Sequence, residues 1–309
     1  MPFSAQDWPI GAALLQFPDA QDAPAARWAA TLYEVADAGF AHVDLTDTWT
    51  RPGDLAPERR RELAGALREV GLGVTAISTV RRSVTDPDED RAAENLAYLL
   101  RTVEAAAELG VGVVSVGLHR ELTARQRAAV WFWTEPGAGD PAGDERVRAL
   151  AVGRLRAVGE RAAGLGVAVS LEMYEDTFLG TAESAVRLVR EIGLANVGLN
   201  PDIGNLVRLH RPVEDWERIM VETAPYANYW HLKNYYRDHD PATGAYFSVP
   251  APAESGFVDY RRAVEIALAA GFAGPICVEH YGGDGLGVSA SNRDYLRRVL
   301  ATKLRGGAR

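Results

Sequence analysis

The chain has 309 residues, 47% of them hydrophobic, which is enough to bury a large core in one big α/β domain or two smaller ones. Its net charge of -9, with no dense run of Lys or Arg, repels phosphate backbones and argues against a nucleic-acid partner. Because there is no run near the roughly 18 apolar residues of a membrane span, no signal-peptide pattern, and only one cysteine, we expect a soluble, cytoplasmic protein without a membrane partner or disulfides.

Strand-like apolar runs alternate with helical patterns along the first half of the chain. The spacing predicts strands that begin near residues 11, 41, 73 and 112. Helices are expected at residues 25–38, 57–70, 89–109 and about 144–165. Gly39, Gly71 and Gly110 follow the first three of these helices, where glycine commonly stops a helix.

The alternation continues in the second half, with strands expected to begin near residues 167, 196, 227 and 274. The matching helices are expected at residues 181–192, 212–223, 258–270 and 289–300. Eight β-α units of this length predict a (β/α)8 TIM barrel, as a single domain over residues 1–309. An open doubly wound sheet is the rival, but no Gly-x-Gly-x-x-Gly motif follows the first strand.

Long connections follow the fourth and seventh predicted strands. Both are strand-to-helix loops, the class that builds the catalytic mouth of such barrels. The loop after the fourth strand carries Trp131 and Trp133, which could stack on a sugar or an aromatic group or could pack the loop onto the barrel. We therefore expect an enlarged mouth.

The alternation of side chains within the strands separates an axial face from a face toward the helices. In the fifth strand, Val169 and Leu171 point outward while Ser170 and Glu172 point to the axis. The same alternation applies to the sixth, seventh and eighth strands. Together the four strands place polar residues on the axial face at their C-terminal ends: Glu172, Asp202, His231 and Glu279.

Carboxylates that converge in a barrel mouth repel one another unless a cation compensates them. Three carboxylates and one imidazole suit one Mn2+, Mg2+, Co2+ or Fe2+ ion better than structural zinc, which prefers sulfur and nitrogen ligands. The alternative is that these residues form internal salt bridges with Lys233, Arg237 or Arg81.

Four sequence segments also carry a resemblance: Leu-Glu172-Met, Gly-Leu-Asn-Pro-Asp202-Ile-Gly-Asn205, His231-Leu-Lys233-Asn234 and Val-Glu279-His280. They resemble the strand-end motifs of the xylose isomerase-like TIM barrel superfamily, the sugar phosphate isomerase/epimerase family. The resemblance implies one divalent metal ion, often Mn2+, held by Glu172, Asp202, His231 and Glu279.

For the reaction, the resemblance implies a sugar isomerase or epimerase in which Glu172 and Glu279 transfer protons beside a carbonyl. It also implies a substrate contact for Arg237, six residues after the metal histidine. We add Lys233 and Asn205 as candidate substrate contacts, and His119, at the axial end of the fourth strand, as a candidate catalytic residue. His119 could equally be a buried structural histidine.

The chain departs from the family pattern at two positions. Asn205 stands where a histidine often contacts substrate, and Phe178 stands where ketose 3-epimerases commonly have a glutamate. Glu172 to Gly180 and the Gly282-Gly-Asp-Gly segment look closer to the catalytic subunits of bacterial C-glycoside deglycosidases. That resemblance implies cleavage of 3-oxo-glycosides by elimination, together with a small β subunit.

Two further functions share this barrel. A metal-dependent phosphodiesterase would need more axial histidines and a basic groove, which six His and a charge of -9 do not supply. A noncatalytic sugar-binding barrel would not need four intact metal ligands. We therefore expect a carbohydrate or glycoside as the small-molecule substrate, and an oligomeric enzyme.

Overall fold

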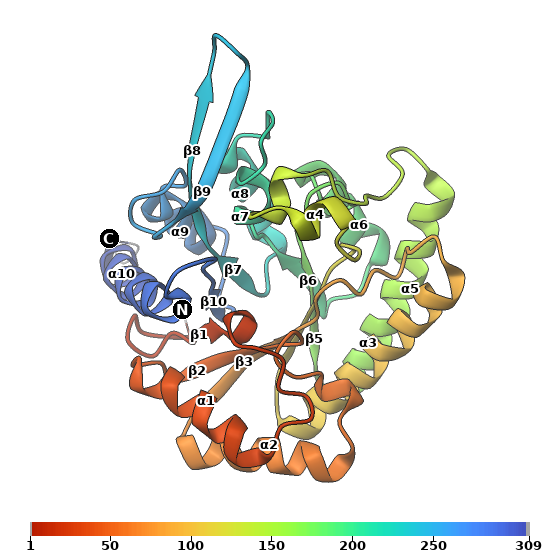
Figure 1. Ribbon diagram of the computed structural model, residues 1–309, viewed down its shortest axis with the longest axis vertical. Helices are drawn as coiled ribbons and strands as arrows, with labels where there is room; N and C mark the ends of the chain where they lie inside the picture. Colours follow the sequence, from red (N-terminus) through yellow and green to blue (C-terminus); the bar gives the residue numbers. More distant parts are fainter. Residues whose placement is uncertain (1, 307–309) are drawn as a thin grey trace.

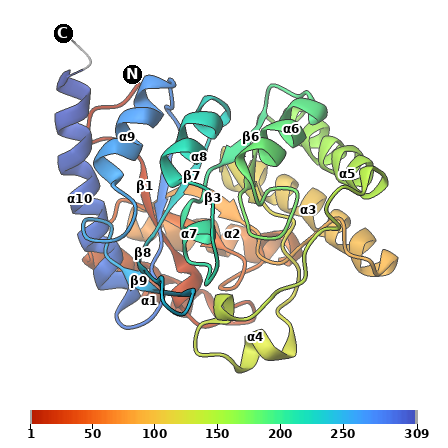
Figure 2. The same cartoon turned by 90° about the horizontal axis from the view of Figure 1, so that it is seen from above.

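Eight parallel strands form a nearly closed barrel in the computed structural model, which describes residues 2–306 (Figures 1 and 2). Their order around the barrel is β6-β5-β4-β3-β2-β1-β10-β7, so the first strand joins the last in register, with Gly11 opposite Cys277. The strands are β1 (Ile10–Ala13), β2 (His42–Thr46), β3 (Gly73–Ser78), β4 (Val113–Val116), β5 (Ala168–Glu172), β6 (Val197–Asn200), β7 (Trp230–Leu232) and β10 (Ile276–Val278). The predicted (β/α)8 barrel is confirmed.

Helices cover the outside of the barrel and begin and end where local chemistry favours it. The Asp88 side chain caps α3 by accepting from the backbone of Asp90 and Arg91, and Gly71 ends α2 in the left-handed region. The helices are α1 (Ala25–Asp37), α2 (Pro57–Val70), α3 (Glu89–Leu109), α4 (Ala124–Ala128), α5 (Glu145–Ala163), α6 (Ala182–Ile192), α7 (Gly204–Val207), α8 (Trp216–Thr223), α9 (Tyr260–Ala269) and α10 (Gly285–Gly306). Within residues 2–306, no helix combines the length and apolar character needed to cross a membrane.

Two of the helices differ from the expectation by more than two residues at an end. The helix expected over residues 212–223 begins only at Trp216, because Asp215 caps it. The helix expected over residues 289–300 extends in both directions, as α10. The short helices α4 and α7 were not expected, because segments of so few residues carry no periodic signal.

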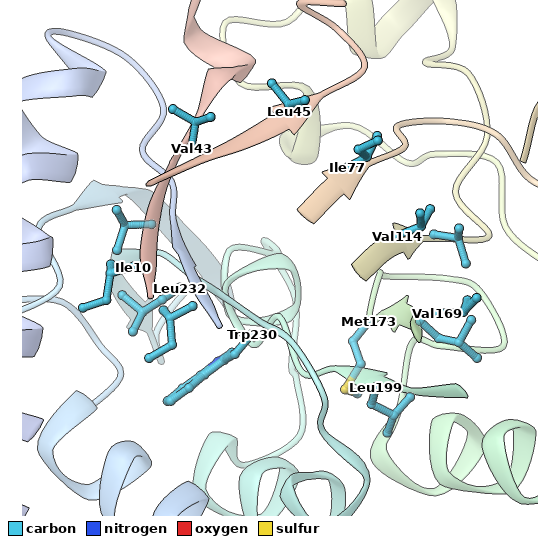
Figure 3. Packing of buried hydrophobic residues seen from close by; sticks show 14 of the residues in the cluster. Ile10, Val43, Leu45, Ile77, Val114, Val169, Met173, Leu199, Trp230 and Leu232 are labelled. Carbon is cyan, nitrogen blue, oxygen red and sulfur yellow. The ribbon is translucent and has the colours of Figure 1, made fainter. Parts of the chain in front are cut away.

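The buried core has two parts, which follow from the alternation of side chains in the strands. Outward residues of the strands, such as Val169, Leu199 and Trp230, pack against the helices (Figure 3). A small axial cluster is formed by Ala13, Ala76, Val113, Tyr229 and Cys277. The predicted division into an axial and an outer face is therefore confirmed. Cys277 is a buried free thiol.

Both expected long loops are present after the strands. The connection from β4 to α5 contains α4 and a short 3-10 helix at Phe132–Thr134. The connection from β7 to α9 contains an antiparallel hairpin, β8 (Asn234–Asp240) and β9 (Ala245–Ala251), which extends away from the barrel (Figure 1). The hairpin itself was not expected.

The joint between β6 and β7 is the weakest in the barrel. Leu199 forms a single bridge with Ala227, and the backbone N–H of Asn228 donates to the Leu199 carbonyl at 3.1 Å. Beyond this bridge, the side-chain carbonyl of Asn200 accepts a hydrogen bond from the His231 backbone N–H at 2.7 Å, in place of a backbone carbonyl. We call this joint, from Leu199–Asn200 to Ala227–His231, the β6–β7 seam.

Candidate active site

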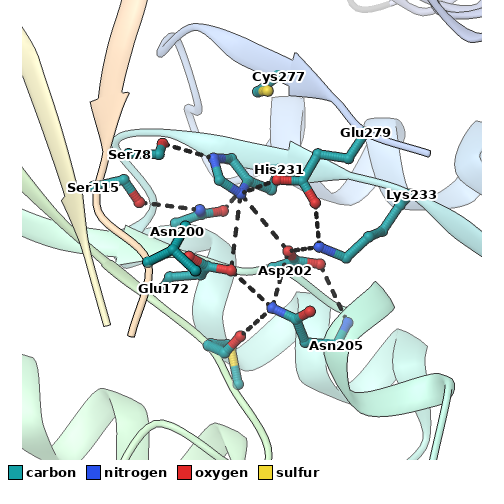
Figure 4. Close-up of polar contacts among 12 residues, drawn as sticks. Ser78, Ser115, Glu172, Asn200, Asp202, Asn205, His231, Lys233, Cys277 and Glu279 are labelled. Carbon is teal, nitrogen blue, oxygen red and sulfur yellow. Dashed lines mark hydrogen bonds and ion pairs between the residues drawn. The ribbon is translucent and has the colours of Figure 1, made fainter. Parts of the chain in front are cut away.

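The four predicted metal ligands converge at the C-terminal end of the barrel (Figure 4). Glu172 ends β5, Asp202 follows β6, His231 lies within β7 and Glu279 follows β10. All four side chains are buried, with exposed fractions between 0 and 7%. One ligand atom each from Glu172, Asp202 and His231 lies within 4.8 Å of the others. The structure therefore brings together, from separate strands, the residues that the sequence predicted.

The His231 ring connects two sets of groups through its two nitrogens. Its Nδ1 faces the three carboxylates, at 3.0 Å from Glu279 Oε1, 3.8 Å from Asp202 Oδ2 and 3.9 Å from Glu172 Oε1. Its Nε2 faces Ser78 Oγ at 3.3 Å and Asp44 Oδ2 at 3.8 Å. The ring is therefore held from behind while Nδ1 points into the cluster.

Lys233 and Asn205 complete the cluster. The Lys233 ammonium donates to Asp202 at 2.5 Å and also to Glu279. The Asn205 amide nitrogen, on α7, lies 2.9 Å from Glu172 Oε1 and 3.0 Å from Asp202 Oδ2. Both side chains are buried, so these contacts are made away from bulk water. The internal salt bridges considered for Lys233 are thus present, alongside the convergent ligands.

Burial and neighbouring charges shift the two glutamates in opposite directions. Burial raises the pKa of Glu172 to about 7, although the His231 ring opposes this rise. Burial also acts to raise the pKa of Glu279, but the adjoining Lys233 ammonium and His231 ring outweigh it and hold that pKa well below its usual range. One carboxyl is therefore close to half-protonated at neutral pH while the other stays ionised.

The donor set fits a hard divalent cation. Within the described chain, His231 Nδ1 has no hydrogen-bond partner of good geometry, although it is buried among three carboxylate oxygens. With all three carboxylates ionised and the His231 ring neutral, as metal binding requires, the carboxylates and the Lys233 ammonium sum to a charge of -2, which one divalent ion balances. Oxygen donors with one imidazole are the ligands that Mg2+ and Mn2+ accept. These residues could therefore hold a metal ion.

A cavity of about 210 Å3 opens onto this cluster. Glu172, Glu279, Lys233, Asn205 and His231 all line it. Its lining also includes residues from the loops after β2, β3, β4, β5 and β10, among them Thr48, Arg81, His119, Phe132, Tyr174 and Tyr281. A larger hollow of about 950 Å3 lies beside the mouth, but none of the four predicted metal ligands lines it, so the smaller cavity is the candidate active site.

His119 lies in the wall of this cavity, as expected for an axial residue after β4. Its ring stacks on Tyr174 with centroids 4.2 Å apart, and only 3% of the residue is exposed. Burial and the positive charges of Arg81, Arg208 and Lys233 hold the pKa of His119 well below its usual value. His119 is therefore a neutral imidazole beside the candidate active site.

Three predicted substrate contacts are placed elsewhere. Trp131 and Trp133 stack on each other at 5.0 Å, and Trp133 is buried against Tyr235 and Tyr281. The side chain between them, Phe132, lines the cavity instead. The short 3-10 helix that begins at Phe132 turns the two tryptophans into the loop's own packing, the alternative that the sequence left open.

Arg237 does not reach the cluster either. It lies on β8, and its guanidinium donates to the backbone carbonyls of Val207, Leu209 and Arg211. The unexpected hairpin carries this residue away from the barrel axis, so its spacing of six residues from His231 does not bring it into the cavity. Arg237 instead ties the hairpin to the end of α7 and the segment after it.

Sequence reasoning missed the groups behind His231. Asp44 Oδ2 accepts from Ser78 Oγ and from the Tyr229 hydroxyl, both at 2.6 Å, and Asp44 is fully buried. The alternation in β2 carried a usable signal, because Asp44 shares the axial face while Val43 and Leu45 pack outward. Ser78 and Tyr229 carried the same signal, because they alternate with the outward residues Ile77 and Trp230.

Comparisons with known proteins are consistent with this geometry. A family model described as "Xylose isomerase-like TIM barrel" matches residues 32–299. A xylose isomerase-like TIM barrel protein from Mycobacterium smegmatis, solved in complex with magnesium, is 42% identical, with 98% of this chain and 99% of that chain covered and a TM-score of 0.93. No match was found among curated protein sequences.

More distant solved structures share the fold. The 3-keto-D-glucoside 4-epimerase from E. coli is 18% identical, with a TM-score of 0.68 over 94% of this chain and 99% of that chain. Mannonate dehydratase from Streptococcus suis is 15% identical, with a TM-score of 0.70 over 98% of this chain and 95% of that chain. At these identities the likeness shows the barrel alone.

Proposed function

The chain belongs to the xylose isomerase-like TIM barrel family, and from this premise we propose that it is a divalent-metal-dependent enzyme that moves a proton next to the carbonyl of a sugar or sugar conjugate. The reaction is of the isomerase or epimerase type. Glu172, Asp202, His231 and Glu279 are the proposed metal ligands.

The observation that carries the proposal is the pair of glutamates in one small cavity. Glu172 and Glu279 both line it, from strands on different sides of His231. Two carboxyls that line one cavity can act as base and acid in one turnover. The cavity volume of about 210 Å3 is below the ~300–1,000 Å3 of sites for drug-sized ligands and suits a monosaccharide.

Each side chain has a role in this proposal. Glu172 takes or returns the proton at the carbon beside the carbonyl, and Glu279 serves the opposite transfer. The divalent ion, when bound, supplies Lewis-acid stabilisation of negative charge on substrate oxygens. Lys233 and Asn205 hold Glu279, Glu172 and Asp202 in place, and both line the cavity where substrate hydroxyls bind.

The test is exchange of a substrate C–H proton in D2O, followed by NMR over a panel of ketoses and 3-oxo-glycosides with Mg2+ or Mn2+ added. Glu172→Gln and Glu279→Gln should each lower the exchange rate about 100-fold or more, because one acid-base group is lost. Glu121→Gln, on the exposed surface of the loop after β4, is the matched control and should keep the wild-type rate. Metal content is measured in parallel, and unchanged exchange in a variant that no longer binds metal would contradict the proposal.

The metal and the finer reaction remain part of the proposal. The similar protein from Mycobacterium smegmatis was solved in complex with magnesium, whereas we expect Mn2+. Proton-exchange rates measured with Mg2+ and with Mn2+ decide between the two ions. The alternative reaction, cleavage of 3-oxo-C-glycosides, is supported by the neutral His119 in the cavity wall, which could take the C–H proton that an elimination removes. It predicts release of an aromatic aglycone and dependence on a co-expressed small β subunit.

A further inference from the structure

Arg81 stands out in the wall of the candidate active site. It follows the end of β3 by three residues and lines the same cavity as Glu172, Glu279 and Lys233. Its φ of 58° lies in the left-handed region, which a side chain other than glycine rarely adopts. Such a conformation costs conformational free energy and is found mainly at sites where the surrounding structure holds a residue for a purpose.

The charge of Arg81 is not matched by a carboxylate. Among residues 2–306, no Asp or Glu oxygen lies within ion-pair distance of its guanidinium. Two of its N–H groups donate to the Arg120 carbonyl at 2.8 Å and to the Tyr174 hydroxyl at 3.1 Å, and the guanidinium lies over Phe132 at 5.0 Å. Donors of the guanidinium fork remain free. Arg82, by contrast, faces Asp47 at 3.7 Å and lies over Tyr98.

The other charges around the cavity are already balanced. Lys233 pairs with Asp202 and Glu279. The negative charge that remains on these two carboxylates and Glu172 is the charge that one divalent cation neutralises. Arg208, behind the Tyr174 ring, pairs with Glu175 at 2.9 Å. Arg81 is therefore the cation in the cavity wall whose charge stays uncompensated.

His119 is a second polar residue of the same cavity wall. Its Nδ1 is buried and has no hydrogen-bond partner within the described chain, although its ring lines the cavity. Nδ1 and Cε1 face Gly117, so this edge of the ring is turned to the end of β4 and not to the cavity. Tyr174 joins the two residues, because it stacks on the His119 ring and accepts from Arg81.

We propose that Arg81, beside His119, forms an anion subsite, so that the substrate of the proposed reaction is an acidic sugar with a carboxylate or phosphate group away from its reacting carbonyl. This inference rests on the proposed function, since it names the substrate class of the same cavity. The Arg81 fork suits a planar or tetrahedral group of anionic oxygens, and a neutral sugar would leave its charge unmatched.

The test compares the binding of D-glucuronate, D-glucose 6-phosphate and D-glucose to the Mg2+-loaded protein by isothermal titration calorimetry. At least one of the two acidic sugars should bind 10-fold or more tightly than D-glucose, and the one preferred identifies the carboxylate or the phosphate. Arg81→Gln should abolish this preference, Arg81→Lys should retain most of it, and Arg82→Gln, the matched control, should leave it unchanged. Thermal unfolding of each variant verifies folding.

Two results would overturn the subsite. The first is equal affinity of the wild-type protein for acidic and neutral sugars. The second is an acid preference that survives in Arg81→Gln, which would place the anion on the metal ion instead. Proton exchange in D2O separates the two proposals. If a neutral ketose exchanges its proton and acidic sugars are not preferred, the proposed reaction stands and the subsite is wrong. If acidic sugars are preferred but no sugar exchanges a proton, the subsite stands and the proposed reaction is wrong.

Discussion

At the scale of single residues, the orientation of His231 depends on groups that the metal would never touch. Asp44 and Ser78 face Nε2, so that Nδ1 stays directed at the three carboxylates. Replacing Asp44 by Asn removes the negative charge behind the ring, and loss of such a supporting group typically lowers metal affinity about 10- to 100-fold. We therefore expect the Asp44→Asn variant to bind Mn2+ about 10- to 100-fold more weakly than the wild type, as measured by calorimetry.

The matched control for this prediction is Asp47→Asn. Asp47 is also buried and lies three residues further along, but its carboxylate accepts from Val80 N–H at 2.9 Å and from the Tyr98 hydroxyl at 3.3 Å, away from His231. Its Mn2+ affinity should equal that of the wild type. Equal affinities in all three proteins would show that Asp44 does not position the ring.

Asp47 has a consequence of its own for stability. Burial raises its pKa from 3.8 to about 7, despite the opposing charge of Arg82. Between about pH 4 and pH 7 the folded state therefore binds a proton that the unfolded state releases, and the free energy of unfolding falls as pH rises through this window. Across this window, the free energy of unfolding should fall by roughly 2 to 4 kcal/mol less in the Asp47→Asn variant than in the wild type.

Urea unfolding at pH 5, 6, 7 and 8, followed by circular dichroism, measures this difference. The free energy of unfolding of the variant minus that of the wild type should increase with pH up to about pH 7 and then level off, because Asp47 is ionised above its pKa. Parallel stability curves for the two proteins would mean that Asp47 ionises in the folded state as it does in the unfolded chain.

The residues of the site were predictable to different degrees. Glu172, Asp202, His231 and Glu279 could be placed because strand alternation and barrel closure constrain a residue at a strand end. Lys233 and Asn205 adjoin those positions in sequence and were found for the same reason. Trp131, Trp133 and Arg237 lie on long connections, where the direction of a side chain depends on turns and tertiary packing that no periodicity encodes.

At the scale of elements, the β8–β9 hairpin gives Arg237 a structural role. Its guanidinium joins β8 to the carbonyls of Val207, Leu209 and Arg211. Arg237→Ala should therefore increase amide hydrogen exchange in residues 234–251 and lower the free energy of unfolding by about 1 to 3 kcal/mol, because charge-assisted hydrogen bonds are lost. Proton exchange on substrate should change less than 10-fold, and a larger loss would restore Arg237 as a substrate contact.

Most of the elements of the barrel could be predicted from apolar periodicity and glycine stops, and α2 and α3 have the expected bounds. The hairpin could not, because β8 is rich in charged residues and β9 contains Pro250, both of which are untypical of strands. Its strands stand clear of the core, so Tyr236, Phe247 and Val249 are exposed and no hydrophobic alternation toward a buried face marks them.

At the scale of the whole molecule, the proposed metal ligands lie on both sides of the β6–β7 seam. Asp202 follows β6 and His231 belongs to β7, while few backbone hydrogen bonds join these strands. An ion bound by both would connect the two strands directly. We expect Mg2+ or Mn2+ at 100 times its dissociation constant to stabilise the fold by about 2.7 kcal/mol.

Hydrogen exchange with and without the ion locates this effect. Amides of Asn228 and His231, which bond across the seam, should gain more protection than amides of β3, which is paired on both sides. EDTA should reverse the gain. Uniform protection across the barrel would show that the ion stabilises the fold without strengthening the seam.

The position of β10 between β1 and β7 also determines when the barrel can close during synthesis. Residues 10–13 find their second partner only in residues 276–278, so the ribosome must release almost the entire chain before that edge of β1 is covered. Until then the nascent sheet presents a strand edge that other chains can pair with. A chain truncated after Ala270 should therefore aggregate, which light scattering during expression without chaperones would reveal, whereas the full chain should stay dispersed.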